Sequence, residues 1–183
     1  MGQGIHTAQA MVIAEELEVS LDNIFVSNAL PLPEYGRRLS TSGSASMNKN
    51  FDKLIKIGAT AREMLIKAAS LEWQVPRDEC VAKSGYVSHI SSGRSFIYGE
   101  LTEKASSLAP PQDPRIKNRK EYQLIGQEIP RIDIPGKING SATYGMDVRL
   151  PNLLFAIVKS APRRGGEIAD FNEEKALKIK GVK

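Results

Sequence analysis

Hydrophobic residues recur at three- and four-residue steps between Phe51 and Leu71, which is the spacing of one face of an amphipathic helix. The positions that share this face are Phe51, Leu54, Ile55, Gly58, Ala61, Leu65, Ala68 and Leu71. The pattern predicts a long helix from about Asn48 to Leu71. A glycine in a helix interior costs up to about 1 kcal/mol relative to alanine, so we expect another element to pack closely against Gly58.

The residues before this helix predict one further helix, one strand and a loop. The stretch from His6 to Leu17 has an apolar side and an acidic side, which predicts a first helix. Ile24 to Ser27 is rich in β-branched and aromatic residues and predicts a short strand. Prolines and a glycine between Leu30 and Arg38 predict an irregular loop, in which Arg37 and Arg38 add positive charge.

From Val81 the hydrophobic period changes to two, which is the period of a strand. Three antiparallel strands and a short helix are predicted at Val81–Lys83, Tyr86–Ile90, Arg94–Tyr98 and Tyr98–Ala105. Prolines over residues 108–114 are typical of a linker. Further strands are predicted at Thr143–Val148, Leu153–Val158 and Glu167–Asp170, followed by a short helix capped by Asn172. Together these elements predict an α+β fold.

Composition excludes several classes of protein and site. The chain has 183 residues, of which 41% are hydrophobic and 25% are charged, as is usual for a globular protein. No apolar run approaches the roughly 20 residues that a membrane-spanning helix needs. Cys80 is the single cysteine and the chain has two histidines, so we predict neither an internal disulfide nor a metal site.

Charge is distributed unevenly along the chain. Residues 1–110 hold 11 Lys and Arg against 12 Asp and Glu, whereas residues 111–183 hold 14 against 9. A basic half can indicate nucleic-acid binding. The charges are scattered singly, however, and no aromatic residues interleave with them to stack on bases. We therefore expect a solvated face or a protein contact, and no nucleic-acid partner.

Two short segments carry the candidate binding chemistry. Gly2-Gln3-Gly4 places an amide that both donates and accepts between two flexible glycines, directly before a helix. Thr41-Ser42-Gly43-Ser44-Ala45-Ser46 leads into the long helix, whose first N–H groups and dipole attract anions. The same segment also fits a plain N-cap without a ligand. No nucleophile has a base near it in sequence, so no catalytic residue is predicted.

In combination these segments resemble the large subunit of the molybdenum hydroxylases, the xanthine dehydrogenase and aldehyde oxidase family. Besides Met1–Thr7 and Thr41–Ser46, the resemblance rests on Ile125-Gly126, Pro130–Gly140 and Ala142–Val148. The order of the motifs is similar to the isoquinoline oxidoreductase β-subunit branch. It implies part of a molybdopterin-binding domain over residues 1–109, a proline-rich linker over 110–120 and the start of an α/β hammerhead domain over 121–183.

The resemblance also implies roles for individual residues. Gln3 would hydrogen-bond the pterin, while Gly43, Ser44 and Ser46 would bind phosphate oxygens of molybdopterin in its cytosine dinucleotide form. Gly2, Gly4 and Thr41 complete the predicted cofactor-binding set. Ser42 stands where the family commonly has glycine.

In this family a molybdenum-bound hydroxide hydroxylates an N-heteroaromatic or aldehyde carbon, and a glutamate outside the present sequence acts as base. We therefore expect a fragment that is inactive alone and carries no cofactor. Its expected partners are the rest of the same large chain, an iron–sulfur small subunit and, for the parent protein, a small aromatic or aldehyde substrate. An export signal upstream would direct the parent to the periplasm, and its absence would leave the parent in the cytoplasm.

Two alternatives remain open at the level of sequence. One is a small α+β module without enzymatic activity that uses its basic half to bind an acidic partner or RNA. The other is a purely structural fragment in which the Ser/Gly segment is an empty N-cap.

Overall fold

The computed structural model describes residues 3–30, 32–36 and 39–183. The chain divides into two compact units, residues 1–142 and residues 143–183. In chain order the first unit contains α1 (Ile5–Leu17), η1 (Leu21–Asn23), η2 (Pro33–Tyr35), α2 (Ser46–Trp73), η3 (Arg77–Glu79), β1 (Cys80–Lys83), β2 (Tyr86–His89), β3 (Ser95–Ile97), α3 (Tyr98–Ser106), η4 (Arg119–Glu121) and α4 (Ile134–Ile138). The second unit contains η5 (Gly145–Asp147) and α5 (Glu174–Leu177).

The three strands form one antiparallel sheet in the order β1-β2-β3. Lys83 pairs with Tyr86 across the two-residue turn of Ser84 and Gly85. Both turn residues have positive φ, 52° and 82°, which is the backbone of the hairpin turn that matches the natural twist of two strands. Helices combined with this sheet confirm the predicted α+β class.

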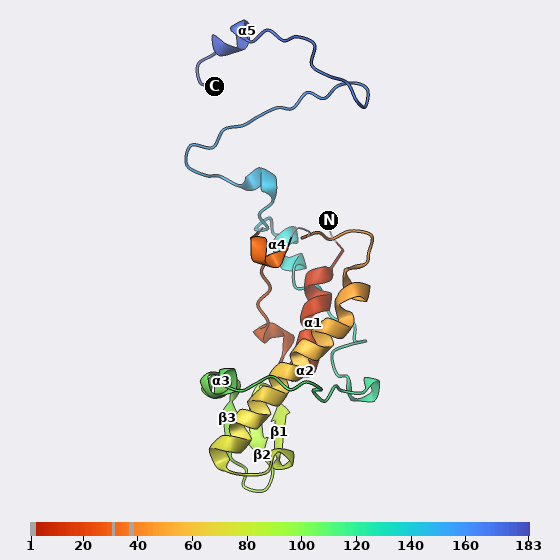
Figure 1. The fold of residues 1–183 in the computed structure, drawn as a ribbon, viewed down its shortest axis with the longest axis vertical. Coiled ribbons are helices and arrows are strands. Elements are labelled where there is room, and N and C mark those ends of the chain that lie inside the picture. The colour runs from red at the N-terminus through yellow and green to blue at the C-terminus, as the bar shows by residue number, and fades with distance from the viewer. Residues whose placement is uncertain (1–2, 31, 37–38) are drawn as a thin grey trace. The chain divides into compact units, whose positions relative to one another are not determined.

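The apolar face of α2 packs on the sheet and on α3, as the periodicity predicted (Figure 1). The buried core that results consists of Leu65, Ile66, Ala68, Ala69, Cys80, Ala82, Val87, Leu101 and Ala105. Trp73, the last residue of α2, stacks on Phe96 with ring centroids 4.9 Å apart. The helix is longer than expected at both ends, because it begins at Ser46 and ends at Trp73.

Helices α1 and α2 run in the same direction and begin at the same end of the first unit (Figure 1). They cross at Gly58, where an added Cβ would lie 2.7 Å from the Cβ of Glu16 and 3.1 Å from the carbonyl oxygen of Ile13. The close packing expected at Gly58 is therefore present, and the element that packs there is α1.

Glu16 is buried at this crossing and pairs with Arg62 of α2. The Arg62 Nη1 donates to the Glu16 carboxylate at 2.8 Å and to the Glu16 carbonyl at 2.6 Å, and both side chains are less than 5% exposed. The other Arg62 nitrogen, Nη2, donates to the carbonyl of Arg115. The acidic side predicted for α1 is thus an interior contact surface in this part of the helix.

Glu15 binds the chain that returns past α1. Its Oε2 accepts backbone N–H groups of Gln123, Leu124 and Ile125 at 2.8, 2.6 and 3.1 Å. Its Oε1 accepts from Lys117 Nζ at 2.7 Å, and this ammonium also pairs with Glu18. A buried carboxylate requires such partners because desolvation alone would cost several kcal/mol.

The prediction of a strand at Ile24–Ser27 is wrong. These residues run without regular structure, and Phe25 is 93% exposed. The β-branched composition favours extended backbone, but a strand also needs a neighbour for its N–H and C=O groups. Within the described chain, the only sheet consists of β1, β2 and β3.

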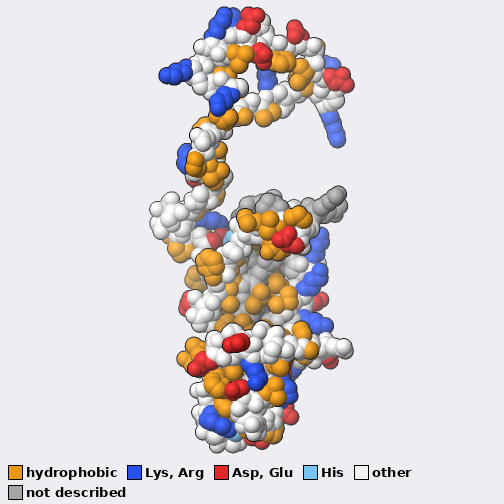
Figure 2. All heavy atoms as spheres, turned by 60° about the vertical axis from the view of Figure 1, so that its left-hand side comes forward, with side chains coloured by type: hydrophobic (Ala, Val, Ile, Leu, Met, Phe, Trp, Pro, Cys, Tyr) orange, Lys and Arg blue, Asp and Glu red, His pale blue; other side chains and the backbone are white. Residues whose placement is uncertain are grey.

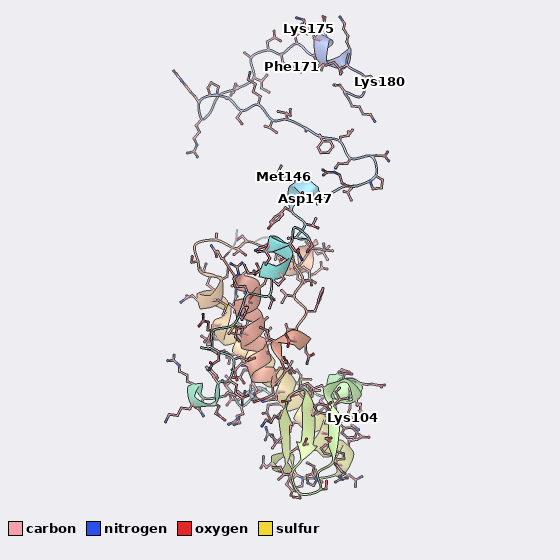
Figure 3. The ribbon with its side chains drawn as sticks, turned by 180° about the vertical axis from the view of Figure 1, so that it is seen from behind. Lys104, Met146, Asp147, Phe171, Lys175 and Lys180 are labelled. Carbon is pink, nitrogen blue, oxygen red and sulfur yellow. The ribbon has the colours of Figure 1, made fainter. Side chains whose placement is uncertain are left out.

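The strands predicted in the second unit are also not formed. All of residues 143–183 are described, and Thr143–Val148, Leu153–Val158 and Glu167–Asp170 contain no strand. Ile157 is 99% exposed, and Met146 and Phe171 are 88% and 72% exposed (Figure 3). Hydrophobic side chains lie on the surface of this unit (Figure 2), so these segments lack the packing that stabilises a strand.

The predicted short helix near the C-terminus is confirmed, whereas the predicted domain boundaries are not tested. The short helix α5 is present, and the Asn172 side chain accepts the N–H of Glu174 at 3.0 Å. Residues 110–120 belong to the first compact unit, and the division of the parent into domains at 109 and 120 stays a prediction. Among the described helices, none has the length and apolar character to cross a membrane.

Replacing Gly58 by alanine is expected to lower the free energy of unfolding by about 1–3 kcal/mol, because the new Cβ meets backbone and a buried side chain. The loss should appear even though alanine is the better helix former by up to about 1 kcal/mol. Gly99 of α3 is the matched control, since an added Cβ there meets nothing within 4 Å. Urea unfolding followed by circular dichroism measures the free energy of unfolding of both variants. Equal losses in Gly58→Ala and Gly99→Ala would show that close packing at Gly58 is not the cause.

Glu15 is expected to make the fold sensitive to acid. Burial alone would raise the pKa of Glu15, but the hydrogen bonds from Lys117 and three backbone N–H groups together lower it. The unfolded chain therefore binds this proton more readily than the folded one. The stability that Glu15 contributes is complete above the ordinary glutamate pKa of roughly 4.3 and is lost as the pH falls through the folded-state pKa.

The variant Glu15→Gln tests this linkage. It should lower the free energy of unfolding at pH 7 by about 3–5 kcal/mol, because Lys117 loses a buried partner. It should also flatten the loss of stability below about pH 5, measured by urea titrations across the acid range. The exposed Glu103 of α3 gives the control variant Glu103→Gln. If both variants kept the acid sensitivity of the parent sequence, Glu15 would not be its source.

Candidate cofactor-binding site at two helix starts

The starts of α1 and α2 present backbone N–H groups that no side chain caps. The N-cap residues are Gly4 for α1 and Ala45 for α2, and neither position has a side-chain cap hydrogen bond. The first N–H groups of a helix have no partner within the helix, and the dipole adds about half a positive charge there. Two such ends on one side of the unit form a surface that favours an anion.

The segment before α2 has an unusual backbone. Gly43 and Ser44 have φ of 60° and 51°, the left-handed region, and Ala45 N–H donates to the Ser42 carbonyl at 3.3 Å. This conformation suits glycine but is uncommon for serine and costs about 1 kcal/mol or more. Ser44 is exposed, whereas Ser46 is partly buried as the first residue of α2.

The segment before α1 has a similar turn. Gly4 has φ of 68°, and its carbonyl accepts the N–H of Ala8 at 3.3 Å, which begins the helix. Gln3 is exposed at this end. Gly2, like Arg37 and Arg38, lies outside the described residues.

A third segment lies at the start of α1. The N–H of Ile132 donates to the buried hydroxyl of Thr7 at 3.0 Å. Arg131 and Asp133 form two parallel hydrogen bonds of 3.0 and 2.7 Å, and Lys137 pairs with the same carboxylate. The hydrogen bond from Arg131, followed by that from Lys137, holds the pKa of Asp133 well below its usual range.

The arrangement can bind an anion by backbone and hydroxyl donors. Among residues 3–30, 32–36 and 39–183, no group of three or more His, Cys, Asp and Glu side chains could hold a metal ion.

The predicted site residues thus fall at two neighbouring helix starts. Gln3 and Gly4 precede α1, while Thr41, Gly43, Ser44 and Ser46 precede or begin α2. Thr7, Arg131 and the buried pair Glu15 and Glu16 are not among the residues predicted from the sequence. Glu15 could have been found from the sequence, because it falls on the apolar face of the predicted first helix. A charged residue on a buried face requires a partner.

The whole chain is similar to known proteins. Residues 1–149 match the model of the molybdopterin cofactor-binding domain. The β-subunit of isoquinoline 1-oxidoreductase from Brevundimonas diminuta is 34% identical over 221 aligned residues, which cover 100% of this chain and 28% of that protein. A nicotinate dehydrogenase subunit from Pseudomonas putida is 34% identical over 93% of this chain and 14% of its own length.

A third relative is the membrane-bound aldehyde dehydrogenase [pyrroloquinoline-quinone] of Gluconacetobacter polyoxogenes, 30% identical over 99% of the chain and 24% of that protein. The chain therefore spans between 14% and 28% of the length of these curated relatives. These names agree with the resemblance seen in the motifs. Since its first 149 residues match the family model, the chain belongs to the family of molybdopterin cofactor-binding domains.

Proposed function

We propose that this chain forms part of the cofactor-binding region of a molybdenum-dependent hydroxylase and helps to hold the pterin and the phosphate of molybdopterin. In this proposal Gln3 hydrogen-bonds the pterin, and the segment of Thr41, Gly43, Ser44 and Ser46 binds phosphate oxygens. Gly2 and Gly4 give the backbone close access to the ligand. The chain holds the cofactor and is not catalytic alone.

The observation that carries this proposal is the pair of uncapped helix starts on one side of the first unit. Phosphate binds well where free N–H groups and the positive end of a helix dipole coincide. The left-handed backbone at Gly43 and Ser44 is strained for serine, and such strain is found preferentially at binding sites. The residues present therefore fit an anionic cofactor.

The parent enzyme in this proposal hydroxylates an N-heteroaromatic or aldehyde carbon. The cofactor, in its cytosine dinucleotide form, supplies the oxidation chemistry when it is bound. The glutamate base, an iron–sulfur small subunit and the remaining cofactor contacts lie outside this chain. Residues 121–183 begin an α/β hammerhead domain whose strands belong to the rest of the same large chain.

Loss of the predicted contacts should lower cofactor content. In the full-length protein that contains this chain, Gln3→Ala and Ser44→Ala should each reduce bound molybdenum and pterin about five- to tenfold, since each removes a hydrogen bond of about 1–1.5 kcal/mol. Metal analysis and the fluorescence of oxidised pterin measure the two components. The exposed Ser106 of α3 gives the control Ser106→Ala. A wild-type protein that folds without molybdopterin would refute the proposal.

The variant Ser44→Gly separates the hydroxyl from the backbone. Glycine adopts φ of about 51° without strain, so the cofactor-free protein should gain up to about 1 kcal/mol of stability. If the hydroxyl binds phosphate, cofactor content should fall as it does in Ser44→Ala. Thermal unfolding of the cofactor-free form measures the stability of each variant, and molybdenum analysis of the loaded form measures its cofactor content. A cofactor content equal to wild type would show that only the backbone at Ser44 matters.

A further inference from the structure

Arg131 lies directly against the turn that precedes α1. A Cβ added to Gly4 would lie 3.5 Å from Arg131 Nε and 3.6 Å from its Cζ, so the guanidinium end of the side chain covers this glycine. The two residues are far apart in sequence. The contact joins Gly4 to the segment that returns past α1.

The guanidinium is held in one orientation. Its Nε donates to Asp133 Oδ1 at 3.0 Å and its Nη2 donates to Oδ2 at 2.7 Å, a forked pair that fixes the plane of the group. The hydrogen bond from Ile132 N–H to the buried Thr7 seats this segment on the first turn of α1. Lys137 Nζ donates to the same Oδ2 of Asp133.

The cluster carries positive charge to the end where the helices begin. Arg131 and Lys137 both pair with the carboxylate of Asp133, so two cations lie in this cluster. The Arg131 side chain is 35% exposed, so a ligand at this end can reach it. An anion there would meet this charge in addition to the helix dipoles.

We propose that Arg131 is a positioning residue of the cofactor site, which holds the backbone of Gly4 in place before α1 and adds positive charge at this helix start. The inference rests on the proposed function. It concerns a residue that the predicted cofactor-binding set does not contain.

The physical reason is the freedom of the turn. Glycines on both sides of Gln3 allow many backbone conformations, and each must be given up when a ligand orders the turn. A rigid side chain packed on Gly4 removes part of that freedom before the ligand arrives. Preorganisation of this kind raises affinity without a new contact to the ligand.

The experiment uses the full-length protein that contains this chain, purified from a host that makes the cofactor. Wild type is compared with Arg131→Gln, Arg131→Lys and the control Arg119→Gln, an exposed arginine of η4. Molybdenum and pterin per folded protein are measured, together with hydrogen exchange at the amide of Ala8, which donates to the Gly4 carbonyl. Arg131→Gln should lose cofactor about tenfold and exchange Ala8 faster. Arg131→Lys should lie between, and Arg119→Gln should match wild type.

The outcomes separate this inference from the proposed function. Wild-type protein without molybdenum refutes both. A wild type that is loaded, with Arg131→Gln loaded to within about twofold, refutes only the role of Arg131. The role of Arg131 is also refuted if Arg131→Gln lowers only the melting temperature and leaves both the cofactor per folded protein and the Ala8 exchange rate unchanged. If Arg131→Gln does not fold, the variant Asp133→Asn tests the proposal instead. It keeps the arginine but weakens the forked pair that holds its guanidinium. Unchanged cofactor content in Asp133→Asn would refute the proposal.

Discussion

The carboxylate of Glu15 fixes the path of the chain past α1. It accepts three successive backbone N–H groups from residues 123–125 and pairs with the ammonium of Lys117. Glu16, one residue later, accepts the N–H of Lys117 and binds Arg62 of α2. Two adjacent buried acids thus join both helices to one returning segment. Every member of this network has a partner, which is the condition under which buried charge is tolerated.

The consequence of this network reaches the candidate site. Once residues 123–125 are fixed beside α1, the chain continues to Ile132, whose N–H binds Thr7 on the first turn of the helix. Arg131 is thereby brought against Gly4. The interior of the helix pair and the surface at its start are therefore parts of one continuous hydrogen-bonded arrangement. A change at Glu15 would be felt at Gly4, although the two residues are separated by most of α1.

The sequence predicted the local structure well where the pattern was periodic. The long helix, the hairpin strands, α3 and the close contact at Gly58 all follow from spacing and residue type. The strand at Ile24–Ser27 failed because a strand depends on a partner that local composition does not reveal. The pairing of Glu15 with residues 117–125 could not be predicted either, since it joins segments that only the tertiary fold brings together. The proposed cofactor-binding residues came from the order of several motifs, each of them weak alone.

The parallel direction of α1 and α2 has an energetic consequence. In an antiparallel pair the two dipoles offset each other, whereas here both positive ends lie on the same side of the unit. That side is electrostatically unfavourable until a negative group neutralises it. An anionic cofactor bound at this end would therefore stabilise the helix pair. Folding of the unit would then be thermodynamically linked to cofactor binding. Protein that has not received its cofactor would open more readily at this end, which would distinguish empty from loaded molecules for the proteases of the cell.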